Sequence, residues 1–148
     1  MPLYAAWASN LDPGRMVERC PHSPVADVGW LTGWRLTFGG EDQHWDGALP
    51  MLVQSPDDQV FVALYDISPL DEQALDESEG ISLGLHDKLH VRVDTLDGPA
   101  VAWTYVLDAY EGGLPSARTL AMISDAAEAA GAPDEYVLAL RERPCQAG

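Results

Sequence analysis

The feature that most constrains the fold of this chain is the order of its predicted strands and helices. Before residue 108, most segments are short, apolar or alternating, and rich in β-branched and aromatic residues, which favours strands. Few helices separate these strands, so they do not alternate with helices as in a parallel α/β sheet. The order predicts an α+β fold, a small curled mixed β-sheet or barrel flanked by helices.

The predicted strands are separated by sequences that favour turns. Ser55-Pro56-Asp57-Asp58 separates two strands, and Leu96-Asp97-Gly98-Pro99 joins the last two in a hairpin. We predict strands over residues 3–8, 25–38, 48–53, 60–67, 88–95 and 100–107.

Prolines and polar capping residues mark the helix starts. Asp12 before Pro13 is typical of an N-cap and first helical residue. Ser68-Pro69-Leu70-Asp71 has the form of a capping box, and Gly80 is the expected C-terminal cap of the helix that it starts. We predict helices over residues 13–20, 69–79, 116–130 and 133–143.

Length and charge limit the classes of function. The 148 residues, of which 47% are hydrophobic, suit a single domain over residues 1–148. A net charge of −16 repels phosphate backbones and anionic lipids, so we expect neither nucleic-acid nor membrane partners. Two distant cysteines and a first segment without signal-peptide features indicate a cytoplasmic location.

The stretch Leu75-Asp76-Glu77-Ser78-Glu79-Gly80 places three carboxylates near a predicted helix end. A helical wheel puts Glu77 and Glu79 on either flank of the apolar face, and so does not choose between them. The helix dipole and the neighbouring acids would raise the pKa of either glutamate, and burial would raise it further. Such a glutamate suits proton transfer near neutral pH, while the alternative is a solvated acidic helix end. The apolar face of this helix would consist of Leu70, Ala74 and Leu75.

The segment Trp7-Ala8-Ser9-Asn10-Leu11 is a second candidate site. A predicted buried strand ends there in small polar residues, and a helix begins soon after. Successive backbone N–H groups at such a corner can bind an anion such as a carboxylate. The alternative is an ordinary turn in which Ser9 and Asn10 satisfy the local backbone.

Metal and nucleophile motifs are not evident in the sequence. His86 and His90 are four residues apart in an alternating segment, and along a strand they would lie ~13 Å apart, too far for one ion. The chain has no G-x-S-x-G elbow, Walker A loop or G-x-G-x-x-G fingerprint. We therefore predict no metal site.

Several segments occur in a specific order. Ser9-Asn10-Leu11 follows the first predicted strand, and Arg19-Cys20-Pro21 precedes Leu31-x-Gly33-Trp34-Arg35-Leu36-x-Phe38. HWDGALPMLVQSPDDQVFVALYDIS at residues 44–68 runs into LDESEGISLG at 75–84, and WTYVLDAYEGGLPS follows at 103–116. Together these segments resemble the gamma-glutamylcyclotransferase (AIG2-like) family over nearly the whole chain.

The resemblance implies a reaction on a small gamma-glutamyl compound. Its alpha-amino group attacks its own gamma-amide carbonyl, which forms 5-oxoproline and releases an amine or amino acid without a cofactor. The family's catalytic glutamate falls on Glu79, and a loop that closes over the pocket falls on Pro115-Ser116. Arg15 is a further candidate for charge pairing. The residues that match substrate-binding positions, or lie beside them, are Trp7, Ala8, Ser9, Asn10, Leu11, His86 and Tyr105.

Three departures from the family pattern affect the expected pocket wall. Trp7-Ala8 stands where Tyr-Gly is usual, and His86 and Thr119 stand where tyrosines are common. The added Cβ of Ala8 would cost ~1 kcal/mol or more if that position has a positive φ. Two alternatives to a cyclotransferase stay open. One is a module that only binds a gamma-glutamyl or other amino-acid ligand, and the other is an enzyme that removes a gamma-glutamyl cap from a biosynthetic intermediate or a gamma-glutamyl amine. The leaving group, and a monomer or homodimer, stay open.

Overall fold

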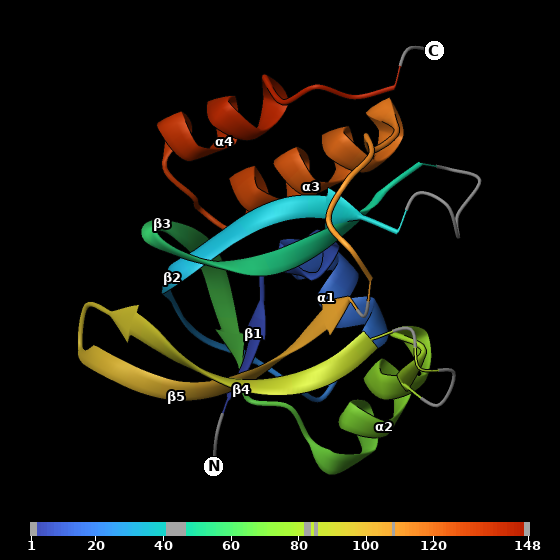
Figure 1. Cartoon of the computed structure of the whole chain (residues 1–148). Helices are drawn as coiled ribbons and strands as arrows, with labels where there is room; N and C mark the ends of the chain where they lie inside the picture. Colours follow the sequence, from blue (N-terminus) through green and yellow to red (C-terminus); the bar gives the residue numbers. More distant parts are fainter. Residues whose placement is uncertain (1–2, 41–46, 82–83, 85, 108, 147–148) are drawn as a thin grey trace.

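The computed structural model describes residues 3–40, 47–81, 84, 86–107 and 109–146. Within these residues, strands close into a barrel in the order β1-β3-β2-β4-β5 (Figure 1). Strand β1 is parallel to β5, and the other neighbouring pairs are antiparallel, so the sheet is mixed as predicted. The strands are β1 (Leu3–Ala6), β2 (Val25–Gly39), β3 (Leu49–Tyr65), β4 (His86–Thr95) and β5 (Gly98–Leu107).

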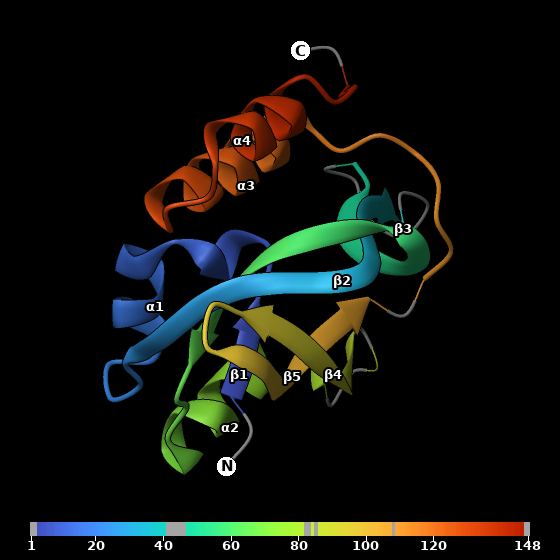
Figure 2. The same ribbon diagram turned by 90° about the vertical axis from the view of Figure 1, so that its left-hand side faces the viewer.

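Helices flank the barrel, which confirms the predicted α+β architecture. Helices α3 and α4 lie side by side at one end of the molecule, and α2 lies at the opposite end (Figures 1 and 2). The predicted N-caps at Asp12 and Ser68 form, and each accepts a hydrogen bond from a backbone N–H in the first turn of its helix. Ser116, which was predicted to lie inside a helix, instead caps α3 in the same way. The helices are the 3-10 helix η1 (Ser9–Leu11), α1 (Pro13–Arg19), α2 (Pro69–Ser78), α3 (Ala117–Ala129) and α4 (Asp134–Arg141).

The prediction of two separate strands over 48–53 and 60–67 is wrong, because both belong to β3. Both parts pair with β2, where Thr32 faces Gln59 and Trp34 faces Gln54. Residues 55–58 are therefore accommodated as a bulge opposite Gly33, whose φ of +88° suits glycine. A turn-forming sequence has bent a long strand without ending it.

Apolar side chains from all five strands form a core that continues under α3. Such burial stabilises a fold by about 25 cal/mol per Å² of apolar surface. Among the fully buried side chains are Ala5, Leu31, Val62, Leu64, Val93 and Ala102 of the barrel and Ala127 of α3.

The predicted apolar face of α2 is wrong in part. Leu75 is buried as expected, but Leu70 and Ala74 are exposed, and Asp71 takes the buried place. The Asp71 carboxylate accepts hydrogen bonds from Ser23 Oγ at 2.7 Å and from a backbone N–H at 2.9 Å. These donors allow an acid to face inward, and its i+4 and i+8 neighbours on the same side of the helix are Leu75 and Glu79.

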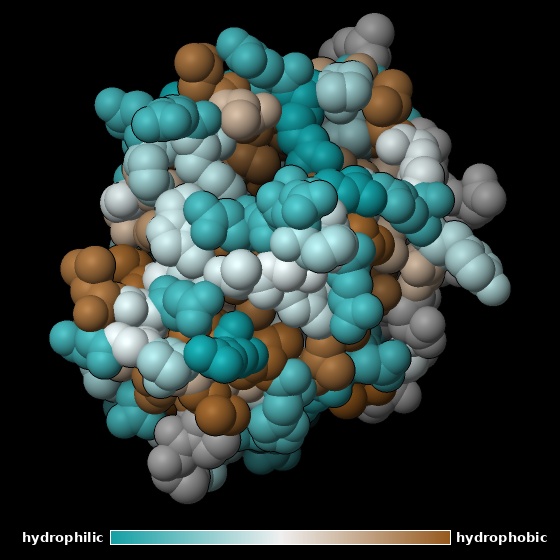
Figure 3. Space-filling model, turned by 60° about the vertical axis from the view of Figure 1, so that its left-hand side comes forward, coloured by the Kyte–Doolittle hydropathy of each residue, from teal (hydrophilic) through white to brown (hydrophobic). Residues whose placement is uncertain are grey.

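The surface carries its hydrophobic residues in small groups. Figure 3 shows one face, on which brown hydrophobic patches are separated by teal hydrophilic residues. Patches of this kind are normal for a folded domain. None of the helices in the described part of the chain is long and apolar enough to span a membrane.

Candidate active site

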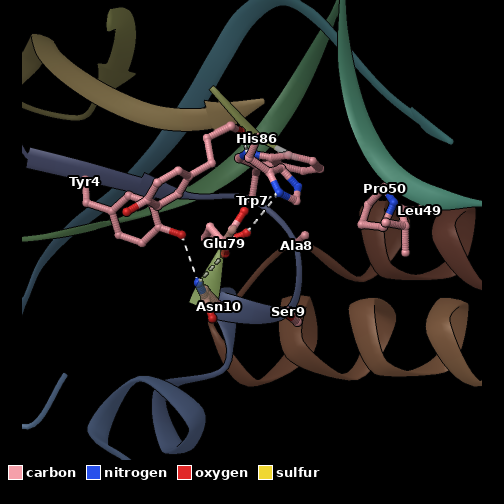
Figure 4. Close-up of a pocket in the computed structure, with 10 residues that line it drawn as sticks. Tyr4, Trp7, Ala8, Ser9, Asn10, Leu49, Pro50, Glu79 and His86 are labelled. Atoms are coloured by element: carbon pink, nitrogen blue, oxygen red, sulfur yellow. Dashed lines mark hydrogen bonds and ion pairs between the residues drawn. The ribbon is translucent and has the colours of Figure 1, made fainter. Parts of the chain in front are cut away.

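A cavity of about 130 Å³ brings together segments that are far apart in the sequence. The corner after β1, the start of β3, the C-terminal end of α2 and the strands β4 and β5 all contribute to its wall (Figure 4). It is lined by Tyr4, Trp7, Ala8, Ser9, Asn10, Leu49, Pro50, Glu79, His86 and Tyr105. The two candidate sites of the sequence therefore share one cavity.

Glu79 reaches this cavity because of how α2 ends. Its backbone N–H still donates to the carbonyl of Leu75 at 3.0 Å, and Gly80 then turns the chain with a φ of +68°. A side chain at position 80 would be strained in this left-handed conformation. The Glu79 side chain is only 20% exposed, whereas Glu77 faces solvent. The structure thus distinguishes the two glutamates that the helical wheel left equivalent.

Burial raises the pKa of the Glu79 carboxyl, the direction that the sequence predicted. His86, Arg19, Arg15 and a hydrogen bond from Asn10 act in the opposite direction, because each favours the carboxylate. The expected repulsion from Asp76 is not among the causes. That carboxylate lies 2.9 Å from Lys88 Nζ and accepts a hydrogen bond from Tyr105.

The Asn10 side chain connects two residues of the cavity wall to an arginine outside it. It is 3% exposed, and its Nδ2 group donates to Tyr4 Oη at 3.0 Å and to Glu79 Oε1 at 3.3 Å (Figure 4). Its Oδ1 accepts a hydrogen bond from Arg19 Nη1 at 3.0 Å. Asn10 thus donates a hydrogen bond to Glu79 while its own amide oxygen is bound by Arg19.

The polar corner is the beginning of η1. The first hydrogen bond of this helix runs from the Leu11 N–H to the Ala8 carbonyl at 3.1 Å. The N–H groups of Ser9 and Asn10 precede this bond, so the helix gives them no partner. Ala8 has a φ of −126°, so its Cβ does not incur the cost of a left-handed conformation.

His86 lies at the start of β4 and covers Glu79. Its Nδ1 is 2.7 Å from the Glu79 backbone carbonyl and 3.7 Å from Glu79 Oε2. Because a carbonyl only accepts, Nδ1 must carry a proton in this contact. The Nε2 atom takes no part in this contact.

Comparisons with known proteins identify the family of the chain. The sequence profile of the AIG2-like family matches residues 59–140. The chain belongs to the AIG2-like family. A human protein named gamma-glutamylcyclotransferase is 31% identical over 139 residues, which cover 90% of this chain and 74% of that protein. The mouse protein of the same name is 30% identical with the same coverage.

Solved structures of related proteins have the same fold. A structure titled gamma-glutamyl cyclotransferase superimposes with a TM-score of 0.88 and 29% identity, over 98% of this chain and 89% of that one. A human protein titled uncharacterized superimposes with a TM-score of 0.87 and 30% identity, over 97% and 88% of the two chains.

Most of the residues that the AIG2-like resemblance selected line the cavity. Leu11 does not, because it is fully buried in the core. Pro115 is buried beside Gly47, and Ser116 caps α3 with Thr119 in its first turn, so this loop is not part of the cavity wall.

Three lining residues were missed from the sequence: Tyr4, Leu49 and Pro50. Tyr4 could have been found, because side chains alternate along a strand and residues 4 and 8 of the predicted strand therefore point to the same side. Leu49 and Pro50 reach the cavity through the pairing of β3, for which the sequence offers no local signal.

Proposed function

We propose that the chain is a gamma-glutamyl cyclotransferase. It converts a small gamma-glutamyl compound into 5-oxoproline and a free amine or amino acid. The observation that carries this proposal is the Glu79 carboxylate, buried beside Asn10 in a cavity whose rim includes the start of η1. The names of the related proteins support the same reaction class.

The reaction needs a group that accepts and then returns a proton. Glu79 would take a proton from the substrate alpha-ammonium, and the resulting amine would attack the gamma-amide carbonyl carbon. The new carbon–nitrogen bond closes the five-membered lactam as the bond to the leaving nitrogen breaks. Glu79 would give its proton to that nitrogen as the bond breaks, and the second proton lost by the attacking nitrogen would pass to the released amine, so the products are the lactam N–H and an ammonium group and no water is consumed. A raised pKa suits both steps, because a carboxyl group whose pKa lies closer to neutral pH can accept a proton and then return it.

The corner before α1 would hold the substrate alpha-carboxylate. The backbone N–H groups of Ala8, Ser9 and Asn10 are the proposed donors, and a chain folded back on itself would gain several kcal/mol from proximity. Trp7 and Tyr105 belong to the same wall, and the Trp7 Nε1–H donates to the Tyr105 carbonyl at 3.1 Å. Tyr105 would position the substrate through its ring, since its hydroxyl already donates to Asp76.

The size of the cavity supports a small recognised group. At about 130 Å³ it is below the ~300–1,000 Å³ that is usual for ligand pockets. We therefore propose that the glutamyl part occupies it and that the leaving group projects outward.

The cytoplasmic location stays a prediction, which cell fractionation would check. Whether the protein is a monomer or a homodimer also stays open, and light scattering would decide it.

A panel of gamma-glutamyl dipeptides, gamma-glutamyl amines and larger conjugates, assayed for 5-oxoproline, tests the proposal. Product from dipeptides or small amines supports a cyclotransferase of small substrates. Product from larger conjugates alone indicates removal of a gamma-glutamyl cap. Binding across the panel without product would overturn the proposal in favour of a binding module.

A further inference from the structure

We propose that Arg19 is a positioning residue of this site, which fixes the orientation of the Asn10 amide against Glu79. The inference deepens the proposed function and rests on it. Arg19 does not line the cavity, and neither the family resemblance nor the comparisons assign it a role.

The first step concerns which end of the Asn10 amide faces Arg19. A guanidinium group has donors only, so the atom that it contacts at 3.0 Å must be the amide oxygen. The NH₂ group then necessarily faces the other way, toward Tyr4 and Glu79. A flipped amide would set its NH₂ group against a cation and its oxygen against a carboxylate.

Burial makes this orientation matter. Because Asn10 is 3% exposed, water cannot replace a hydrogen bond that a flipped or rotated amide would lose. Without Arg19, the Asn10 oxygen would be left without a charged donor, and the amide could rotate away from Glu79.

Arg15, one turn earlier on α1, provides a contrast. Its Nη1 contacts Met122 Sδ at 3.3 Å, and its Nε is buried without a hydrogen-bond partner among the described residues. Both arginines lower the pKa of Glu79 through their charge, and Arg19 does so more strongly. Of these two arginines, Arg19 is the one that donates a hydrogen bond to Asn10.

The consequence for catalysis is a distinction between the two oxygens of Glu79. Oε1 accepts a hydrogen bond from the Asn10 amide at 3.3 Å, whereas Oε2 lies 3.7 Å from His86 Nδ1. Oε2 is therefore the oxygen that would exchange a proton with the substrate. By fixing the Asn10 amide, Arg19 would keep Glu79 Oε2 oriented toward the cavity.

The test compares Arg19→Met and Arg19→Lys with wild type. The readouts are kcat and KM against pH, the NMR titration of the Glu79 carboxyl, and the Asn10 side-chain NH₂ resonances. We expect Arg19→Met to lower kcat by about 10–100-fold with a smaller change in KM, since small misplacements at a site cost up to ~10²-fold. The pKa of Glu79 should rise, and Arg19→Lys, which keeps a charged donor, should recover part of the rate.

Two controls separate the effects. Arg15→Met removes a nearby charge and should raise the pKa of Glu79 while leaving the Asn10 resonances close to wild type. Arg141→Met removes an arginine of α4 that is paired with Asp125 and Glu128 on the surface. It should leave all readouts unchanged.

Wild-type kcat and unchanged Asn10 resonances in a folded Arg19→Met protein would overturn the proposal. The NMR readouts do not require turnover, so they also decide it if no gamma-glutamyl compound is converted. If Arg19→Met does not fold, Arg19→Gln replaces it in the test. A fully active Arg19→Gln protein with altered Asn10 resonances would contradict the proposal, because the Asn10 amide would have moved without an effect on the rate.

Discussion

Two inward-facing acids, Asp71 in α2 and Glu79 at its C-terminal cap, have opposite electrostatic environments. Two short hydrogen bonds, from Ser23 Oγ and the His22 N–H, hold the Asp71 carboxylate, and its pKa is lowered chiefly by the first. Glu79 has one longer hydrogen bond, from Asn10, and burial raises its pKa. Asp71 fastens the helix to the segment after α1, while Glu79 keeps proton-accepting capacity for a ligand.

The largest expected effect comes from removing the acid in the cavity. Glu79→Gln should lower kcat by about 10²–10⁴-fold, the usual contribution of general acid–base catalysis, with little loss of substrate binding. Release of 5-oxoproline and substrate binding by calorimetry would measure the two effects. Glu77→Gln is the matched control because Glu77 is exposed two residues away. An equal loss in both variants would mean that Glu79 has no special role.

The same two acids should give opposite dependences of stability on pH. The folded pKa of Asp71 is lowered, so its stabilisation is present above the unfolded pKa and is lost as pH falls through the folded value. The folded pKa of Glu79 is raised, so stability falls as pH rises from the unfolded to the folded value.

Asp71→Asn should therefore lower the midpoint of thermal unfolding by several degrees at pH 7, with a smaller loss in acid. Glu79→Gln should be neutral in acid and stabilising above the folded pKa of Glu79. Thermal unfolding across this pH range would measure both. The same pH trend in the two variants would remove the distinction between them.

Much of the fold could be predicted because its signals are local. Capping sequences at Asp12 and Ser68 predicted two helix starts, and a turn sequence predicted the hairpin of β4 and β5. The continuity of β3 could not be predicted, because pairing with β2 outweighs the turn propensity of residues 55–58.

The site was predicted from short motifs, and its missing parts are those that depend on distant contacts. The helical wheel alone could not choose Glu79. It also placed Leu70 on the buried face of the helix, because nothing in α2 itself shows that Ser23 donates a hydrogen bond to an inward-facing Asp71. The role we assign to Arg19 likewise arises only when α1 folds back beside Asn10.

His86 offers a smaller perturbation of the same carboxylate. His86→Phe removes the contact of Nδ1 with the Glu79 carbonyl and a group whose charge lowers the pKa of Glu79. We expect kcat to fall by roughly 10-fold and the acid limb of kcat/KM to move to higher pH, since the carboxylate loses a favourable neighbour. His86→Tyr, which restores the side chain common in the family, serves as the comparison. An acid limb that moves to lower pH would contradict this role.

The smallest effect is expected at Tyr105. Tyr105→Phe removes the hydroxyl that donates to Asp76 and leaves the ring in the cavity wall, with Lys88 still paired to Asp76 and Glu72. KM should rise only a few-fold, and kcat should change little, as steady-state kinetics would show. A loss of rate comparable to that of Glu79→Gln would place the hydroxyl in the chemistry.

The most direct measurement is the titration of the Glu79 side-chain carboxyl by ¹³C NMR, compared with kcat/KM over the same pH range. We expect both to show one inflection at the same pH, clearly above the ~4.3 of an ordinary glutamate. A Glu79 carboxyl that titrates at its ordinary value, or a rate profile that ignores its titration, would contradict the assignment of proton transfer to this residue.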